Sequence, residues 1–339
     1  MSEPFVSVLS LLLQDSLFNG FAFNKVTRAQ HGVANEVYCL EFREAKFILK
    51  LYKDIFDSRT ADFLIDVCKQ NGINVPRVLK QGVYADRKYI LMEFAEGRHM
   101  YEMADKNISQ IVNLVTKLPT RDVAGICENT IYRKTDLYCS FLKGLRETRL
   151  PCKYIDDVIA KYESVICGMD KENLFIVHGD ISPTNLLWSG ENLTAILDFD
   201  EAVLAPAEYD LIVAVIKFCK VASILNVDLA KKMIRQYIET NQLSDANALR
   251  STWYLYISKV LLEKFYLHES AVIDLYDERQ LKDDWRAWYE LMNNEDMCKV
   301  VFEGIVTNNS VLHKIKSIRN KSCSLEDNFA IEEKSGLLC

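Results

Sequence analysis

The sequence contains little glycine and proline: 12 and 6 residues among 339. Collagen-like, low-complexity and disordered chains are rich in these residues, so their scarcity argues against all three classes. We also find no internal repeat. Hydrophobic residues make up 49% of the chain, enough for a sizeable core. A chain of this length is expected to form one large domain or two unequal ones.

The chain also lacks a long hydrophobic run and an excess of basic residues. No apolar run approaches the roughly 20 residues of a membrane-spanning helix. Residues 8–13 are apolar but have no basic flank and no small-residue cleavage site, which favours an amphipathic helix over a signal peptide. The formal net charge of −7 gives no general attraction to nucleic acid or to an anionic membrane.

The 10 cysteines include no Cys-x-x-Cys pair, the spacing typical of zinc and redox sites. Cys167 and Cys219 lie among apolar residues. This pattern favours buried free thiols over disulfides or zinc ligands. We therefore expect a cytoplasmic protein.

One segment carries most of the functional information: residues 178–185 read HGDISPTN, and residues 198–200 read DFD. Phosphoryl transfer needs a carboxylate that orients the attacking hydroxyl and oxygen ligands that hold magnesium. Asp180 suits the first task, and Asn185 with Asp198 suits the second. A single Asp-x-x-x-x-Asn is common in turns, so the combination of both motifs is what favours a catalytic site.

Short apolar runs surround these residues and predict three strands, of which the last two form a hairpin. The predicted strands are residues 174–177, 186–188 and 194–197. Asp180, Asn185 and Asp198 would then lie at the ends of neighbouring strands, within reach of one ion.

The two motifs resemble the signature of the kinase-like small-molecule phosphotransferases, which include aminoglycoside phosphotransferases, choline kinases and a class of homoserine kinases. That signature is His-Gly-Asp-x-x-x-x-Asn followed by Asp-Phe/Trp-Asp/Glu, and both halves occur here. The resemblance implies an α+β, bilobal, protein-kinase-like fold with a small β-rich N-terminal lobe and a larger, mostly helical C-terminal lobe. We expect the lobes at residues 1–95 and 96–314, followed by a polar, mobile tail at 315–339.

Supporting roles follow for residues around the first motif. We expect His178 to hold the loop through hydrogen bonds and Gly179 to adopt a backbone geometry that a side chain would disfavour. Asp210 precedes the apolar residues 211–225, which predict a buried helix with Asp210 as its N-cap. In the family an Asp at this site braces the catalytic loop, and Asp200 is the other residue that we assign to support.

The resemblance implies a nucleotide-binding lobe upstream of the motifs. Residues 47–52 predict a strand in which Lys50 is flanked by apolar residues, and the family's lysine at this place contacts the nucleotide phosphates. Residues 30–36 resemble the phosphate-covering loop, with Gly32 and Asn35 as candidate contacts, although relatives often have a second glycine. Backbone N–H groups of such a loop can face phosphate oxygens.

The implied cofactors are ATP and Mg²⁺, and the implied partner is a small hydroxylated molecule. The last strand of the small lobe is predicted at residues 89–94. By resemblance, the backbone of Glu93 and Phe94 would hydrogen-bond the adenine.

One element departs from the kinase pattern. Kinases pair the strand lysine with a glutamate of the following helix, but the helix predicted at residues 59–71 contains none. The expected position falls at Thr60. Asp62 or Asp66 is a candidate replacement partner for Lys50, with a shorter reach.

The two late helices predicted at residues 246–268 and 280–293 are rich in aromatic and acidic residues. These residues and those between the helices are Trp253, Tyr254, Tyr256, Tyr266, Asp274, Tyr276, Asp277, Glu278, Asp283, Asp284, Trp285, Trp288 and Tyr289. Such side chains suit a cationic acceptor, for example an aminoglycoside or amino alcohol. The alternative, that the aromatic rings belong to a hydrophobic core, stays open.

We therefore favour an ATP-dependent phosphotransferase that acts on a hydroxyl of a small, cationic molecule. The alternatives are a catalytically silent, kinase-like nucleotide-binding protein and a kinase of an amino acid or sugar metabolite. A protein kinase is disfavoured, since the Ala-Pro-Glu and multi-glycine-loop signatures are missing.

Overall fold

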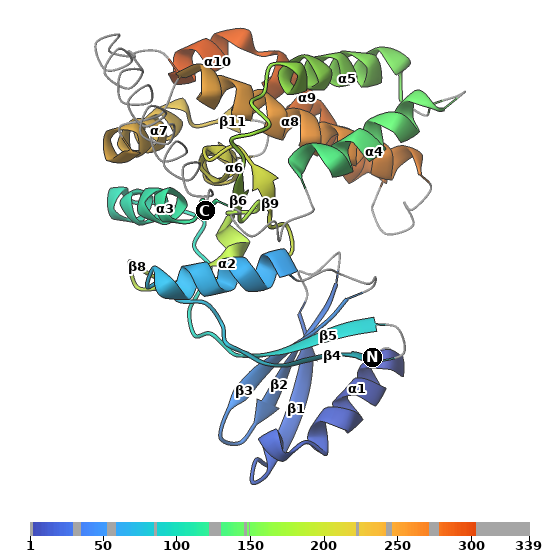
Figure 1. Ribbon diagram of the computed structural model, residues 1–339, viewed down its shortest axis with the longest axis vertical. Coiled ribbons are helices and arrows are strands. Elements are labelled where there is room, and N and C mark those ends of the chain that lie inside the picture. The colour runs from blue at the N-terminus through green and yellow to red at the C-terminus, as the bar shows by residue number, and fades with distance from the viewer. Residues whose placement is uncertain are drawn as a thin grey trace, which may run out of the picture.

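The chain forms two lobes, a sheet with one covering helix and a larger group of helices (Figure 1). The computed structural model describes residues 3–29, 35–52, 59–84, 87–121, 130–145, 148, 150–221, 224–241, 246–270 and 278–302. The expected α+β, bilobal arrangement is confirmed. Gly32 and the predicted tail, residues 315–339, lie outside the described residues.

The N-terminal lobe is built on a five-stranded antiparallel sheet with strand order β1-β2-β3-β5-β4. Its strands are β1 (Phe23–Arg28), β2 (Glu36–Phe42), β3 (Lys46–Leu51), β4 (Val78–Tyr84) and β5 (Arg87–Glu93). Burial alternates along β2 because successive side chains point to opposite faces of the sheet.

Helix α1 (Glu3–Leu13) covers one face of this sheet, and the short η1 (Ser16–Phe18) follows it (Figure 1). Phe5, Val8 and Leu12 of α1 are fully buried, and the ring of Phe5 stacks on Tyr38 at 3.8 Å between centroids. The predicted amphipathic helix at the N-terminus is thereby confirmed.

Helix α2 (Arg59–Gln70) lies at the junction of the two lobes in Figure 1. Three of its buried side chains, Ala61, Leu64 and Cys68, belong to the large hydrophobic core of the C-terminal lobe. The helix therefore joins the sheet's lobe to the helical one.

Eight helices of the described chain belong to the C-terminal lobe. They are α3 (Asp105–Lys117), α4 (Ile131–Lys143), α5 (Cys152–Cys167), α6 (Tyr209–Cys219), α7 (Val227–Asn241), α8 (Ala246–Glu269), α9 (Glu278–Asn293) and α10 (Glu295–Phe302). Helix α6 is buried almost all round, as its apolar sequence predicts.

The predicted helix at residues 211–225 was too long. Helix α6 ends at Cys219, and the chain then forms the antiparallel pair β10 (Lys220–Val221) and β11 (Ile224–Leu225). An apolar run without clear periodicity does not by itself distinguish buried helix from buried strand.

Short strands frame the two sequence motifs. β6 (Phe175–Val177) pairs with β9 (Val203–Ala205), and β7 (Leu186–Ser189) pairs with β8 (Asn192–Ile196), both antiparallel. The 3₁₀ turn η2 (Pro183–Asn185) leads into β7. The predicted hairpin between the motifs is confirmed.

Two further expectations concern the chain as a whole. The cysteines that the structure describes are all free thiols, but the expected burial was wrong for Cys167, which is exposed. No helix within the described ranges is both long and apolar enough to span a membrane.

Candidate active site

A buried carboxylate holds the loop that carries Asp180. Asp210 is fully buried, and its two oxygens accept hydrogen bonds from the backbone N–H groups of His178 and Gly179, each at 2.8 Å. Burial raises the pKa of Asp210, and the hydrogen bonds from the two backbone N–H groups oppose that rise. The N-cap prediction was wrong: Glu208 is the N-cap residue of α6, and Asp210 lies in its first turn and bonds the loop instead.

The ring of His178 connects the two motifs. Its Nδ1 accepts the backbone N–H of Asp180 at 3.3 Å, so the proton resides on Nε2. Nε2 lies 3.0 Å from the carbonyl oxygen of Leu197 and donates to it. His178 is fully buried, so this bridge is shielded from water. The expected loop-holding role agrees with these contacts.

The backbone at Gly179 disfavours any side chain. Its φ of +84° belongs to the left-handed region that favours glycine. A Cβ at this position would lie 2.2 Å from the main-chain oxygen of Glu201, well inside van der Waals contact. Close approach of two backbone segments therefore places Asp180 beside the chain that follows the second motif.

The side chain of Asn185 is bonded to Asp180. Its Nδ2 donates to the main-chain oxygen of Asp180 at 2.9 Å and to the Oδ2 of Asp180 at 2.8 Å. These contacts fix the amide orientation and leave Oδ1 as its acceptor atom for a cation. The main-chain oxygen of Asn185 accepts the N–H of Leu197 at 2.8 Å, which brings Asp198 next to Asn185.

Asp198 has a left-handed backbone with φ of +59°, the one positive φ of a non-glycine residue in the described chain. Asp and Asn tolerate this region better than other residues with side chains. Its side chain is 47% exposed. The conformation turns the chain sharply after β8 and leaves the Asp198 carboxylate accessible.

Lys50 meets both carboxylates of the second motif. Its Nζ lies 2.7 Å from Asp198 Oδ1 and 2.5 Å from Asp200 Oδ2, with only 8% of its side chain exposed. Burial by itself lowers the pKa of Lys50, but the two carboxylates outweigh burial and raise it above its ordinary value. Lys50 is therefore a buried cation with two anionic partners.

The predicted partners of Lys50 on helix α2 were wrong. Among the described residues, its ion pairs are with Asp198 and Asp200. Asp66 instead pairs with Lys69 at 3.2 Å on the surface of its own helix, and Asp62 forms no ion pair with Lys50. Thr60, the position that we expected for the missing glutamate, is buried.

Asp200 is bonded by two side chains of the N-terminal lobe. Its Oδ1 accepts from the hydroxyl of Tyr52 at 2.9 Å, and its Oδ2 accepts from Nδ2 of Asn35 at 2.8 Å. Burial and the Asp200 charge raise the pKa of Tyr52 far above its usual range, so the hydroxyl stays a donor. Tyr52 was not among the predicted site residues; its place two residues after Lys50 was the available signal.

The structure limits the adenine prediction for Glu93 and Phe94. The backbone N–H of Glu93 donates to the carbonyl oxygen of Arg77 at 3.0 Å, and the backbone N–H of Phe94 donates to the carbonyl oxygen of Lys46 at 3.3 Å. Both donors are used within the protein. These two N–H groups are therefore not available as donors to the adenine.

Residues 25–237, more than half of the chain, match the model of a family described as "Phosphotransferase enzyme family". The chain belongs to this family. As a member, the phosphotransferase is an ATP-dependent kinase of small molecules.

Among its relatives, a homoserine kinase from Methylocella silvestris is 22% identical over 230 residues, which cover 64% of this chain and 72% of that protein. An aminoglycoside 3'-phosphotransferase from Campylobacter jejuni is 25% identical over 162 residues, which cover 43% of this chain and 64% of that one.

Two solved structures share the fold of the phosphotransferase. A choline/ethanolamine kinase family protein from Mesorhizobium loti matches with a TM-score of 0.66 at 15% identity, over 88% of this chain and 99% of that one. A spectinomycin phosphotransferase in complex with ADP and spectinomycin matches with a TM-score of 0.60 at 16% identity, over 87% and 97% of the two chains. Likeness at these identities shows the fold alone.

The aromatic residues of the late helices are mostly core residues of the phosphotransferase, contrary to the acceptor-facing interpretation. The five buried ones are Trp253, Tyr254, Tyr256, Trp285 and Trp288. Tyr266 is half-buried and stacks on Tyr138 at 4.8 Å between centroids. Tyr289 is also half-buried, and its hydroxyl donates to Asp157 at 2.6 Å. Asp274, Tyr276, Asp277 and the side chains of Glu278, Asp283 and Asp284 lie outside what the structure describes.

Two clusters of charged residues near Asp180 were not predicted. The Nζ of Lys217 lies 3.6 Å from Asp180 Oδ1. Lys259, nearly buried, contacts Glu201 at 3.5 Å and Glu263 at 3.4 Å. Lys217 follows Asp210 by seven residues, the spacing that repeats on one helix face, and this was the available signal for it.

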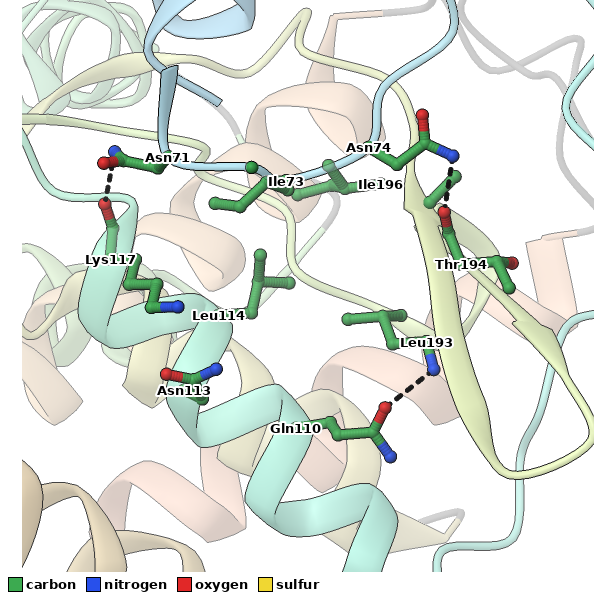
Figure 2. Close-up of a pocket in the computed structure, with 12 residues that line it drawn as sticks. Asn71, Ile73, Asn74, Gln110, Asn113, Leu114, Lys117, Leu193, Thr194 and Ile196 are labelled. Atoms are coloured by element: carbon green, nitrogen blue, oxygen red, sulfur yellow. Dashed lines mark hydrogen bonds between the residues drawn. The ribbon is translucent and has the colours of Figure 1, made fainter. Parts of the chain in front are cut away.

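The structure also contains a pocket of about 230 Å³, which is drawn in Figure 2. Its lining includes neither Asp180 nor the charged residues beside Asp180. It lies between α3, β8 and the connection from α2 to β4. Asn74 donates to the carbonyl oxygen of Thr194 at 2.7 Å, and Gln110 accepts the N–H of Leu193 at 2.8 Å. None of its lining residues belongs to the two motifs.

Proposed function

We propose that the phosphotransferase moves the γ-phosphate of ATP to a hydroxyl of a small molecule, with Asp180 as base and with Asn185 and Asp198 as Mg²⁺ ligands. The contact that best supports this proposal is the pair of hydrogen bonds from the Asn185 amide to Asp180. It joins the candidate base to a candidate metal ligand and fixes the amide so that Oδ1 is the atom left for the ion.

The roles follow from the charges and their positions. Asp180 would take the proton of the acceptor hydroxyl while the oxygen of that hydroxyl forms a bond to the γ-phosphorus of ATP. The bond between the γ-phosphorus and the oxygen that bridges it to the β-phosphate breaks, and ADP leaves. Lys217, 3.6 Å from Asp180, would help to orient the carboxylate. Lys50 would meet the nucleotide phosphates.

The residues fit magnesium chemically. Mg²⁺ prefers oxygen ligands and takes only one or two from the protein when phosphates supply others. Asn185 Oδ1 and the half-exposed Asp198 carboxylate are such ligands. When bound, the ion would neutralise phosphate charge. No group of three His, Cys, Asp or Glu side chains suited to a metal occurs in the described chain, which agrees with a site that relies on phosphate oxygens.

A cationic acceptor, such as an aminoglycoside or amino alcohol, remains part of this proposal, but on different residues. Glu201 and Glu263 are 42% and 31% exposed while Lys259 holds them from the buried side. Glu201 also abuts Gly179, next to Asp180. These carboxylates can attract an amine by charge. A kinase of an amino acid or sugar metabolite is the second candidate, since a homoserine kinase is among the relatives.

Nucleotide-dependent thermal stability tests this function without knowledge of the acceptor. We expect ATP to raise the melting temperature and Mg²⁺ to increase that rise, because a ligand that binds only the folded state stabilises it. Mg²⁺ without nucleotide is the control. A melting temperature unaffected by millimolar ATP, with and without Mg²⁺, would contradict the proposal.

A further inference from the structure

Lys50 requires a fixed anionic partner, and helix α2 does not supply one. The Lys50 side chain is 8% exposed, and a buried charge without a partner is strongly destabilising. In protein kinases a glutamate of the corresponding helix orients the strand lysine. Here Thr60 occupies the matching position, and the partners of Lys50 come from the C-terminal lobe.

The two partners of Lys50 differ in how firmly they are held. Asp198 is 47% exposed and is also the candidate metal ligand. Asp200 is only 21% exposed, and each of its oxygens accepts a bond from the N-terminal lobe. Tyr52, which donates to one oxygen, is itself 4% exposed. A carboxylate with two such donors has one preferred orientation.

We propose that Asp200, fixed by Tyr52 and Asn35, is the positioning residue for Lys50 and takes the place of the missing helix glutamate. Tyr52 directly follows β3, the strand of Lys50, and Asn35 directly precedes β2. Asp200 belongs to the loop after β8. The bonds therefore place the lysine and also tie the phosphate-facing edge of the sheet to the C-terminal lobe.

The test is the affinity for Mg²⁺ and a non-hydrolysable ATP analogue, measured by titration calorimetry on the full chain. This inference rests on the proposed function, in which Lys50 meets the phosphates. Tyr52→Phe removes one hydroxyl and should weaken binding about ten- to a hundredfold, the loss expected for a hydrogen bond to a charged group. Tyr38→Phe is the matched control: Tyr38 is a buried tyrosine of the same sheet, and its hydroxyl donates to Glu36 at 2.6 Å. We expect it to bind like the wild type.

A double-mutant cycle distinguishes positioning from a general effect on the lobe. In a Lys50→Met background, Tyr52→Phe should have no further effect on nucleotide affinity, because the group that it positions is gone. Asn35→Ala removes the donor to the other oxygen and should behave in the same way. If Lys50→Met weakens binding but Tyr52→Phe does not, or if the two losses multiply fully, the inference is overturned and the proposed function stands.

If the wild type binds no nucleotide, the proposed function is refuted but the inference about Asp200 is not. A second double-mutant cycle, measured on protein stability without nucleotide, then tests the inference. Urea unfolding of Lys50→Met, Tyr52→Phe and the double variant measures the same coupling. Each substitution changes the unfolding equilibrium constant by some factor relative to the wild type. We expect the factor for the double variant to differ at least about threefold from the product of the factors for the two single variants. Full additivity in this cycle would overturn the inference.

Discussion

Asn185 donates both hydrogen bonds of its side-chain amide to Asp180, one to the carboxylate and one to the main-chain oxygen. The two residues are thus oriented by each other, and the loop needs no third side chain to set the Asn185 amide. Below them, Asp210 accepts the N–H groups of His178 and Gly179. The predicted chemistry depends on these paired contacts.

Asp180→Asn should separate catalysis from nucleotide binding. A general base contributes about 100- to 10,000-fold to a rate, so we expect kcat to fall by that factor. Nucleotide affinity should stay close to that of the wild type, because in the proposed mechanism Asp180 contacts the acceptor hydroxyl and not the nucleotide. Steady-state rates and calorimetry measure the two effects, with the surface variant Asp66→Asn as a control. An equal loss of nucleotide affinity would show that the base has been misassigned.

Asp198→Asn should have the opposite result. Asn also tolerates the left-handed backbone at this position, so the substitution removes charge with little strain. We expect the Mg²⁺-dependent part of ATP affinity to fall at least about tenfold, since even the outer partners of metal ligands contribute 10–100-fold. Calorimetry at several Mg²⁺ concentrations measures this loss. Unchanged Mg²⁺ dependence would exclude Asp198 as a ligand.

Gly179→Ala should destabilise the protein more than Gly190→Ala does. Both glycines have positive φ, +84° and +58°, but an added Cβ has open space at Gly190 and meets the Glu201 main chain at Gly179. We expect about 1–2 kcal/mol for the backbone strain at each site, plus about 1–3 kcal/mol for overpacking at Gly179. Urea unfolding measures both. Equal losses would mean that the loop moves away from Glu201 at little cost.

Lys217→Met should lower turnover modestly. The pair with Asp180 is partly exposed, and exposed ion pairs contribute about 0.2–1 kcal/mol, which corresponds to a fall in kcat of up to about fivefold. Nucleotide affinity should not change. Lys143→Met is the control, because it breaks an exposed ion pair with Glu163 that involves no residue of the two motifs. A kcat equal to that of the wild type would leave Lys217 without a role in the reaction.

The loop and hairpin around the motifs were predictable because their signals are local. Apolar runs bounded by turn residues mark β6, β7 and β8, and the motif spacing places Asp180, Asn185 and Asp198 near their ends. Each of these inferences depends on residues within one or two turns of chain.

The partners of Lys50 were not predictable in this way. Lys50 and Asp198 are separated by 148 residues, and Asn35 and Asp200 by 165. A local sequence pattern cannot predict which carboxylates of the C-terminal lobe pair with the buried amine of Lys50. The prediction of Asp66 failed because a nearer cation, Lys69, lies one turn away on the same helix.

The composition of the late helices likewise could not show whether their aromatic residues form the hydrophobic core or bind the acceptor. Trp253 and Trp288 would suit either a cation-binding surface or a hydrophobic core, and burial decides for the core. The carboxylates near Asp180 come partly from another segment, since Glu201 follows the second motif. Only the packing of α8 against that segment brings Glu263 and Glu201 to one lysine.

The most direct test of the account is transfer of labelled γ-phosphate from ATP to a panel of amino alcohols, aminoglycosides, hydroxy amino acids and sugars. We expect that at least one acceptor becomes labelled, that ADP forms in equal amount, and that Asp180→Asn loses the transfer while it still binds Mg-ATP. Transfer by Asp180→Asn at the wild-type rate would contradict it.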